Sequence, residues 1–286
     1  MKSEEQPVAI VTGASAGLGL VIAERLMTEG YRVMIVGRDT ARLHAAKTRL
    51  ESAVGSSPRN ADASRPEPQV ATHCCDLTDQ TAVGGLVADV RSTFGKLNVL
   101  VNCVGASDRG LIESLDADHA EFLFRQNVVT ALLCSQASLP MLEESSGVIV
   151  NIGSLASKVG ARYIGGYAIA KHALAGMTQQ MRLELKPRGV HVGLINPGPI
   201  RRDDEGQRYR EQINKDLPDQ ASRPGAGTRV KGLPPETVAD GVIRLIQGRR
   251  PDMVLPRYLR VLIATGHAFP RLGDWLLLKF TSPGDD

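Results

Sequence analysis

Aromatic side chains are scarce in this chain of 286 residues, at 4% of the composition. Nucleic-acid surfaces stack bases on aromatic rings and gather positive charge, whereas Lys and Arg are scattered here and the net charge is only +3. No apolar run reaches the length of a membrane-spanning helix, and the polar start 1–7 does not resemble a signal peptide. We therefore expect no nucleic-acid partner and no spanning segment.

Metal-binding and disulfide patterns are missing as well. The four cysteines show no C-x-x-C spacing, and the six histidines show no H-E-x-x-H. Cys74 and Cys75 are adjacent in an apparent strand, where neighbouring side chains point to opposite faces, so a bridge between them is not expected. The sequence predicts four reduced thiols, no metal site and a cytoplasmic location.

Short apolar runs and helix-periodic segments alternate along the chain. The runs predict strands over 8–11, 31–36, 70–75, 97–101, 148–152, 190–195 and 253–256. Helical spacing lies between them, most clearly over 18–27, 43–50, 83–94, 119–138 and 234–246. This alternation predicts an α/β fold: one doubly wound, Rossmann-type domain over 1–286, a three-layer sandwich with a seven-stranded, mainly parallel sheet.

A glycine-rich turn joins the first strand to the first helix. It reads T-G-A-S-A-G-L-G over 12–19. Glycines let backbone bend sharply and approach a phosphate closely, and a helix N-terminus attracts negative charge. The turn therefore predicts a site for the pyrophosphate of a dinucleotide, formed by Gly13, Ser15, Ala16, Gly17, Leu18 and Gly19.

Two side chains suited to proton transfer stand one helical turn apart. Tyr167 and Lys171 are separated by three residues compatible with a helix, so both lie on one face. A neighbouring ammonium favours the phenolate and lowers the pKa of a phenol from its usual value of about 10. Ser154 follows the strand-like run 148–152, at a carboxyl end where ligands bind in open α/β sheets. Taken alone, the Tyr-x-x-x-Lys spacing also fits a solvated helix face.

Together these motifs resemble the short-chain dehydrogenase/reductase family, whose loop is T-G-x-x-x-G-x-G and whose catalytic pattern is this Ser, Tyr and Lys set. The resemblance runs from about residue 8 to about residue 256. It implies reversible hydride transfer between a nicotinamide cofactor and a carbonyl/alcohol pair. Tyr167 would be the acid and base, Lys171 would lower its pKa and hold ribose hydroxyls, and Ser154 would bind the carbonyl oxygen. A dinucleotide-binding sensor without turnover is the rival interpretation.

The same resemblance implies further site residues. Asn102 and Gly105 stand in N-C-V-G where the family shows N-N-A-G, so Cys103 and Val104 depart from its pattern. Asn127 is similar to the asparagine that distorts a helix and holds a water beside the lysine; an exposed helix face is the alternative. The remaining positions similar to the family's cofactor contacts are Asp76 (alternatively a helix cap), Leu77, Pro197, Gly198 and Ile200.

The end of the second strand predicts the form of the cofactor. Sites that prefer NAD usually place an acid there, whereas this sequence reads Val36-Gly37-Arg38. An arginine can bind a 2′-phosphate with two hydrogen bonds, so we expect NADP(H) over NAD(H). Asp39 is the competing candidate, but it stands two places later and can cap the next helix instead.

Three segments lie outside the repeating pattern. Residues 52–69 predict an exposed loop insertion, and 201–232 predict a substrate lid or a simple surface excursion. The apolar extension 257–286 predicts two short amphipathic helices within 259–280, with Arg257, Arg260, Arg271 and Lys279 nearby. It resembles family branches that reduce lipid-like ketones at membranes; packing over the chain's own pocket or against another subunit is the alternative. Family habit implies a homodimer or homotetramer.

Overall fold

A computed structural model describes residues 6–55, 70–201, 217–218, 221, 225, 228 and 230–281. These residues form one sheet of seven parallel strands in the order β3-β2-β1-β4-β5-β6-β7. The strands are β1 (Val8–Thr12), β2 (Arg32–Gly37), β3 (Val70–Cys74), β4 (Val99–Asn102), β5 (Val148–Ile152), β6 (His191–Pro197) and β7 (Asp252–Leu255). The expected fold is confirmed, and the sheet is wholly rather than mainly parallel.

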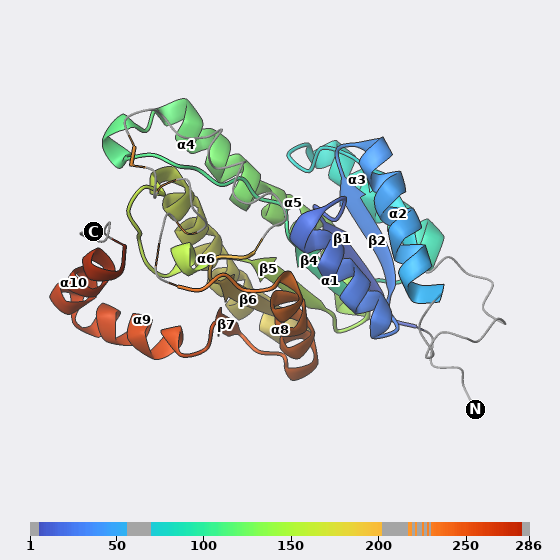
Figure 1. Ribbon diagram of the computed structural model, residues 1–286. Helices are drawn as coiled ribbons and strands as arrows, with labels where there is room; N and C mark the ends of the chain where they lie inside the picture. The colour runs from blue at the N-terminus through green and yellow to red at the C-terminus, as the bar shows by residue number, and fades with distance from the viewer. Residues whose placement is uncertain are drawn as a thin grey trace.

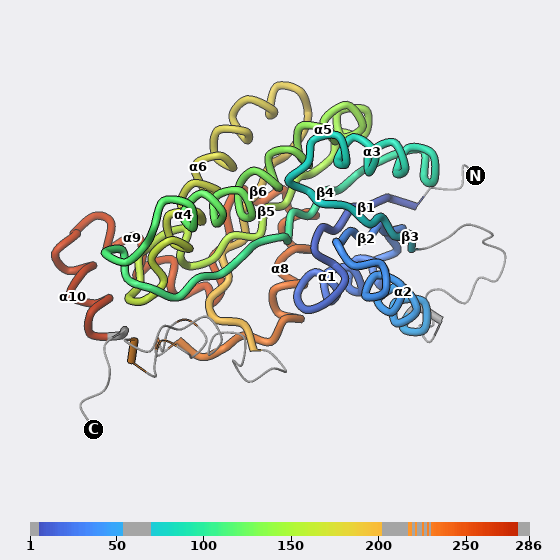
Figure 2. Tube along the Cα trace, turned by 90° about the horizontal axis from the view of Figure 1, so that it is seen from above, coloured from blue at the N-terminus to red at the C-terminus, as the bar shows by residue number. Residues whose placement is uncertain are grey.

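Helices cover both faces of the sheet (Figures 1 and 2). One face carries α1 (Gly17–Thr28), α2 (Thr40–Gly55) and α8 (Pro235–Gly248). The other carries α3 (Gln80–Phe94), α5 (Thr130–Glu144) and α6 (Gly165–Leu185). Beyond these layers lie α4 (Ala117–Phe124) and, at one end of the molecule, α9 (Leu259–Ala268) and α10 (Pro270–Thr281).

The hydrophobic core is divided by the sheet, because successive residues of a strand point to opposite faces. In β1, Ala9 and Val11 pack toward the α1, α2 and α8 layer, whereas Val8 and Ile10 pack toward the α3, α5 and α6 layer. The apolar side chains on both faces of these strands are fully buried, which explains why the central strands read as continuous apolar runs rather than alternating ones.

The side of β1 on which the chain adds strands to the sheet changes after β3. From β1 the chain builds outward through β2 to β3, and it then returns to place β4 on the opposite side of β1. The carboxyl ends of these two strands therefore meet at the crevice where open α/β sheets bind ligands. The glycine-rich turn follows β1, and the 102–105 turn follows β4.

The predicted span 119–138 is helical throughout, as α4 and α5 joined by a π-helical turn at Arg125–Val129, so the distortion that the family resemblance implied at Asn127 is present. The loop predicted over 52–69 begins later, because α2 continues through Gly55; the rest of that loop, 56–69, lies outside the described residues.

The C-terminal extension forms the two expected short helices, α9 and α10. No helix among the described residues is both long and apolar enough to cross a membrane. Much of the expected lid, including 202–216, and the chain end 282–286 lie outside the described residues. The two ends of the lid region are held together, since Arg201 N donates to Leu233 O and Leu233 N donates to Pro199 O.

Candidate active site

A large cleft opens along the carboxyl ends of the strands, with a volume of about 1630 Å³. Pockets for drug-sized ligands typically occupy about 300–1,000 Å³, so this cleft has room for a dinucleotide together with a second molecule. Every candidate site residue named from the sequence lines it except Asn102. The cleft thus collects residues from the glycine-rich turn at one end to Tyr167 at the other.

The glycine-rich turn leaves the N-terminus of α1 without a protein cap. Gly17, at the first position of α1, has φ of +58°, a left-handed conformation that favours glycine, and an added Cβ would meet nothing within 4 Å. Ala16 gives no side-chain cap, and the first turn of α1 holds no acidic residue. Its backbone N–H groups are therefore available for an anion, and the turn fits the pyrophosphate of a dinucleotide.

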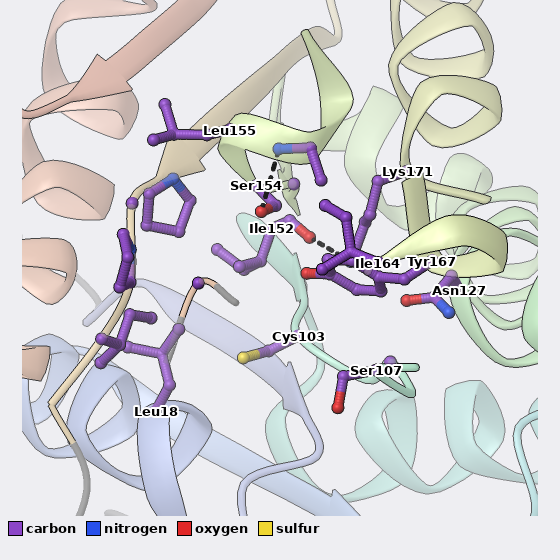
Figure 3. Close-up of a pocket in the computed structure, with 18 of the residues that line it drawn as sticks. Leu18, Cys103, Ser107, Asn127, Ile152, Ser154, Leu155, Ile164, Tyr167 and Lys171 are labelled. Carbon is purple, nitrogen blue, oxygen red and sulfur yellow. Dashed lines mark hydrogen bonds between the residues drawn. The ribbon is translucent and has the colours of Figure 1, made fainter. Parts of the chain in front are cut away.

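Tyr167 and Lys171 project from the first two turns of α6 into the cleft. Lys171 Nζ lies 5.7 Å from the centroid of the Tyr167 ring. Because Tyr167 stands in the first turn, where no acidic residue is present, the positive end of the helix dipole adds to the effect of the ammonium. Figure 3 shows the hydroxyls of Tyr167 and Ser154 facing the same space, with Leu18 and Cys103 across from them.

Lys171 is an almost fully buried cation. Its side chain is 4% exposed, and Nζ donates a 2.9 Å hydrogen bond to the carbonyl of Ile152 at the end of β5. Burial lowers the pKa of Lys171 to about 8, and the nearby Cys103 partly opposes this. The ammonium form therefore still predominates at neutral pH, where its charge is available to the neighbouring phenol.

Asn127 lies in the π-helical turn, and its hydrogen bonds there explain why an asparagine is found inside a helical pattern. Its Nδ2 donates to the carbonyls of Leu123 and Ala106, each at 2.9 Å. Its Oδ1 is buried and has no hydrogen-bond partner among the described residues. A Cβ added to Gly105 would lie 2.6 Å from this oxygen and 3.4 Å from Lys171 Nζ, so the glycine makes room for both groups.

Ser154 is held by the short 3₁₀ turn that follows β5, Leu155–Ser157. Its Oγ accepts a hydrogen bond from Ala156 N at 3.2 Å, and its own backbone N–H donates to Ser157 Oγ at 3.0 Å. This reciprocal arrangement is a capping box. Because Oγ uses a lone pair toward the backbone, its proton is left to be donated to an oxygen in the cleft.

At the other end of the cleft, Arg38 and not Asp39 lines the wall. Asp39 accepts a 3.0 Å hydrogen bond from Arg42 N, as a residue capping α2 does. A Cβ added to Gly37 would lie 3.2 Å from Ser15 Oγ, which leaves little room for a carboxylate at that position. Hydrogen bonds from Thr78 lower the pKa of the Asp76 carboxyl, with a smaller contribution from Arg38.

Asn102 points away from the cleft into the core. Its Nδ2 donates to Asn151 Oδ1 at 2.8 Å and to Ser135 Oγ at 3.1 Å. Asn151 Nδ2 continues to Thr178 Oγ1 at 2.9 Å, and that hydroxyl donates to Leu174 O. The chain of bonds fixes β4 and β5 to α6, so Asn102 supports the site without touching its ligand space. The wall of the cleft is formed instead by the next residues, 103–105.

Sequence reasoning left open what the C-terminal extension packs against and named none of its residues as part of the site. Leu262, Ile263 and Leu277 of α9 and α10 line the cleft, and so does His267. His267 Nε2 lies 2.7 Å from the carbonyl of Lys158, just after the turn that carries Ser154. Amphipathic spacing was visible in this segment, but nothing in the sequence indicated which wall its apolar side chains would form. One face therefore packs over the chain's own pocket, as one of the alternatives held.

The arrangement gathers complementary groups around one point. A proton donor at Tyr167, a second donor at Ser154 and a buried positive charge at Lys171 border the same space. Such a set can bind a carbonyl oxygen, supply it with a proton and stabilise the anion that remains on the phenol.

Comparisons with known proteins agree with the chemistry that this arrangement can perform. A family model described as short chain dehydrogenase matches residues 7–213. An uncharacterized oxidoreductase of Staphylococcus saprophyticus is 32% identical over 197 residues, which cover 68% of this chain and 79% of that protein. A 3beta-hydroxysteroid dehydrogenase of Mediterraneibacter gnavus is 29% identical over 196 residues, or 68% of this chain and 66% of that protein. The crystal structure of an actinorhodin polyketide ketoreductase variant with NADPH is 25% identical, with a TM-score of 0.74 over 89% of this chain and 97% of that one.

Proposed function

The chain belongs to the short-chain dehydrogenase family, and from this premise we propose that it interconverts a ketone or aldehyde and an alcohol with NADP(H), using Tyr167 as acid and base. The observation that carries the proposal is the convergence of Tyr167, Lys171, Ser154 and Asn127 on the cleft that also contains the uncapped N-terminus of α1. The family's oxidoreductase chemistry supplies the reaction type.

A bound nicotinamide would supply or accept the hydride. The protein's contribution in reduction is to orient the carbonyl and to deliver a proton. Ser154 and Tyr167 donate hydrogen bonds to the carbonyl oxygen, and Tyr167 passes its proton to that oxygen as negative charge develops. Lys171 and the N-terminus of α6 stabilise the resulting phenolate. In oxidation the same groups act in reverse.

Reprotonation of Tyr167 is proposed to pass by Lys171 and Asn127. Lys171 Nζ has three donors, and the described residues give one of them a protein acceptor, Ile152 O. Asn127 Oδ1, the unpaired acceptor, borders the same glycine as Lys171 Nζ. A water bound between these atoms would complete the hydrogen bonding of both and connect the lysine to solvent.

The preference for NADP(H) rests on the end of β2. Arg38 lines the cleft, Asp39 is engaged at the start of α2, and Gly37 carries no carboxylate. An arginine attracts a 2′-phosphate, whereas the acid typical of NAD sites would repel it. The ketoreductase similar to this chain was crystallised with NADPH. A thermal-shift comparison of the two reduced cofactors tests the preference, and a larger shift with NADH would overturn it.

The substrate half of the cleft favours an apolar carbonyl compound. Its lining includes the apolar side chains of Leu155, Val159, Ile164, Ile263 and Leu276. Removing an apolar substrate from water against these side chains is favourable in proportion to the area buried. The match to a 3beta-hydroxysteroid dehydrogenase is consistent with such a substrate class.

Tyr167→Phe separates this function from a cofactor-binding sensor without turnover. The variant should lose carbonyl-dependent NADPH oxidation while keeping its thermal shift with NADPH, because the phenol oxygen transfers the proton but does not hold the pyrophosphate. Tyr31→Phe, at a half-buried tyrosine outside the cleft lining, is the matched control. Unchanged oxidation of NADPH in Tyr167→Phe would refute the proposed acid.

A further inference from the structure

Exposed apolar side chains concentrate on the C-terminal helix pair, here called the α9–α10 hairpin (257–281). Thirteen large hydrophobic residues are exposed in the described part of the chain, and seven belong to this short segment: Tyr258, Val261, Leu262, Phe269, Leu272, Trp275 and Leu278. Val261 is 72% exposed and Trp275 is 54% exposed. Single exposed apolar residues are ordinary, but a group of this kind marks a surface that is covered by something else.

The hairpin is a built unit rather than a loose end. Its helices cross with their backbones in contact, since a Cβ added to Gly273 would lie 2.8 Å from Gly266 O and 2.9 Å from Gly266 Cα. Its inner face lines the cleft, and His267 fastens it to Lys158 O. Figures 1 and 2 both show the pair at the end of the molecule away from α2 and β3. The exposed apolar side chains of the hairpin that do not line the cleft are here called its outer face: Val261, Phe269, Leu272, Trp275 and Leu278.

Cationic side chains surround this outer face. In the extension 257–286, Arg257, Arg260, Arg271 and Lys279 are basic and Asp274, Asp285 and Asp286 are acidic. All four basic residues lie in the described hairpin, whereas Asp285 and Asp286 follow it, outside the described residues. Asp274 faces the cleft, whereas none of the four basic residues lines it. Lys279 Nζ lies 4.9 Å from the Trp275 ring centroid, over an indole that suits the boundary between lipid and water.

Helical spacing places the apolar and basic side chains together. In α10, Arg271, Trp275 and Leu278 follow at intervals of four and three, and Arg257 stands in the turn just before α9. Helices that lie in the plane of a bilayer surface carry Lys and Arg on a polar face and Trp, Phe or Leu on the apolar face below the head groups. A long basic side chain at the boundary of the two faces reaches back to the head groups. With 10 and 12 residues, α9 and α10 have lengths that fit lying on a membrane rather than crossing it.

We propose that the outer face of the α9–α10 hairpin docks on the surface of an anionic lipid bilayer. A second copy of the chain is the less suitable occupant, because a twofold contact would place the same four cations of each hairpin against each other. Anionic head groups instead complement them, because the negative potential of such a surface attracts Lys and Arg side chains that lie close to it.

Docking would also give apolar substrates a route into the cleft. Leu262 is 44% exposed and lines the cleft as well, and Tyr258 is likewise exposed and lining, so apolar surface continues from the outer face to the interior. This part of the inference rests on the proposed carbonyl reduction. The substrate class is then a carbonyl compound dissolved in the membrane, which reaches Tyr167 without crossing bulk water.

The chain's only tryptophan reports on docking directly, because Trp275 lies on the outer face. Full-length protein is mixed with vesicles of phosphatidylcholine alone or with about 30% phosphatidylglycerol, an anionic composition that should draw the basic hairpin. The expected result is co-flotation with the anionic vesicles, a blue shift of the Trp275 emission, and release by salt. Arg271→Gln should weaken binding about fivefold, and Val261→Ser should weaken it too. Leu183→Ser, at an exposed apolar site on α6, is the control and should bind as the wild type does.

Each alternative outcome is distinct. Absence of flotation with anionic vesicles, or equal flotation with neutral ones, overturns the proposal. A blue shift that grows with protein concentration and needs no vesicles also overturns it, in favour of a second copy. NADPH oxidation with a small water-soluble ketone is measured in parallel and should be unchanged in Arg271→Gln. Turnover without vesicle binding refutes docking alone, whereas vesicle binding without any turnover refutes the proposed function alone.

Discussion

Replacing Lys171 by methionine should abolish turnover and should also change the stability of the ligand-free protein in a pH-dependent way. The side chain is 4% exposed, and burial lowers the pKa of Lys171 from 10.5 to about 8. One pKa unit corresponds to about 1.4 kcal/mol, so holding this charge inside the protein costs about 3 kcal/mol of folding free energy at neutral pH. Methionine fills a similar space without a charge and removes that cost.

The direction of this pH dependence follows from the protonation of Lys171 in the folded and in the unfolded state. Below the folded pKa of about 8 the ammonium is charged in both states, and the full cost is present. As the pH rises toward 10.5 the folded protein gives up its proton first, so wild-type stability increases relative to the uncharged variant. Between about pH 7 and about pH 9.5, the free energy of unfolding of the wild type should rise by about 2 kcal/mol relative to that of Lys171→Met. Loss of the hydrogen bond to Ile152 O should lower the free energy of unfolding of the variant by about 1 kcal/mol at every pH. It therefore leaves the pH dependence of the difference between the two proteins unchanged.

Urea unfolding of the ligand-free proteins, followed by circular dichroism at several pH values, measures this difference. Lys186→Met, at an exposed lysine, is the matched control. The reasoning would be refuted if Lys171→Met were less stable than the wild type by the same amount throughout the range. That result would mean that hydrogen bonding, and not the burial of charge, dominates at this lysine.

Three further substitutions test other parts of the site. Arg38→Gln should raise the KM for NADPH about ten- to a hundredfold and leave that for NADH unchanged, as expected for losing a charge-assisted hydrogen bond; equal losses in steady-state kinetics with both cofactors would contradict the assignment. Gly105→Ala should lower kcat and the melting temperature together, because its methyl group would lie 2.6 Å from Asn127 Oδ1; normal kcat would show that this oxygen is free to move. Thr178→Val should lower the free energy of unfolding by about 1–3 kcal/mol by leaving Asn151 Nδ2 without its acceptor, and an unchanged urea midpoint would argue against the buried network.

The sheet and its order of elements followed from the sequence because both signals are local. The apolar runs of buried parallel strands, such as 148–152, need no knowledge of distant contacts to be recognised. Strand ends moved by one or two residues, as at β4, since hydrogen-bond ladders and not hydrophobicity define them. The helix over 119–138 followed from its periodicity, whereas the π-helical turn at Asn127 was indicated by the family resemblance alone, because periodicity does not reveal such a turn.

The site residues could be named from motif spacing, but their surroundings could not. Asn102 was expected to contact the cofactor, yet its side chain bonds to Asn151 and Ser135 in the core. Nothing in the sequence places these three polar residues, far apart along the chain, in one buried cluster. Packing of α9 and α10 over the chain's own pocket was among the alternatives, but the sequence did not indicate which of their side chains would line the cleft. Amphipathic spacing indicates that a helix has an apolar face but does not indicate what that face will meet.

The contact between His267 and the carbonyl of Lys158 has a practical consequence for anyone who shortens the chain. A truncation after β7 would retain every motif by which the protein is recognised, from the glycine-rich turn to Tyr167. It would nevertheless release the turn that holds Ser154 from its distal anchor and open one wall of the cleft to water. Such a fragment should still bind the dinucleotide while handling its second ligand poorly, so the minimal catalytic unit extends well past the last recognisable motif.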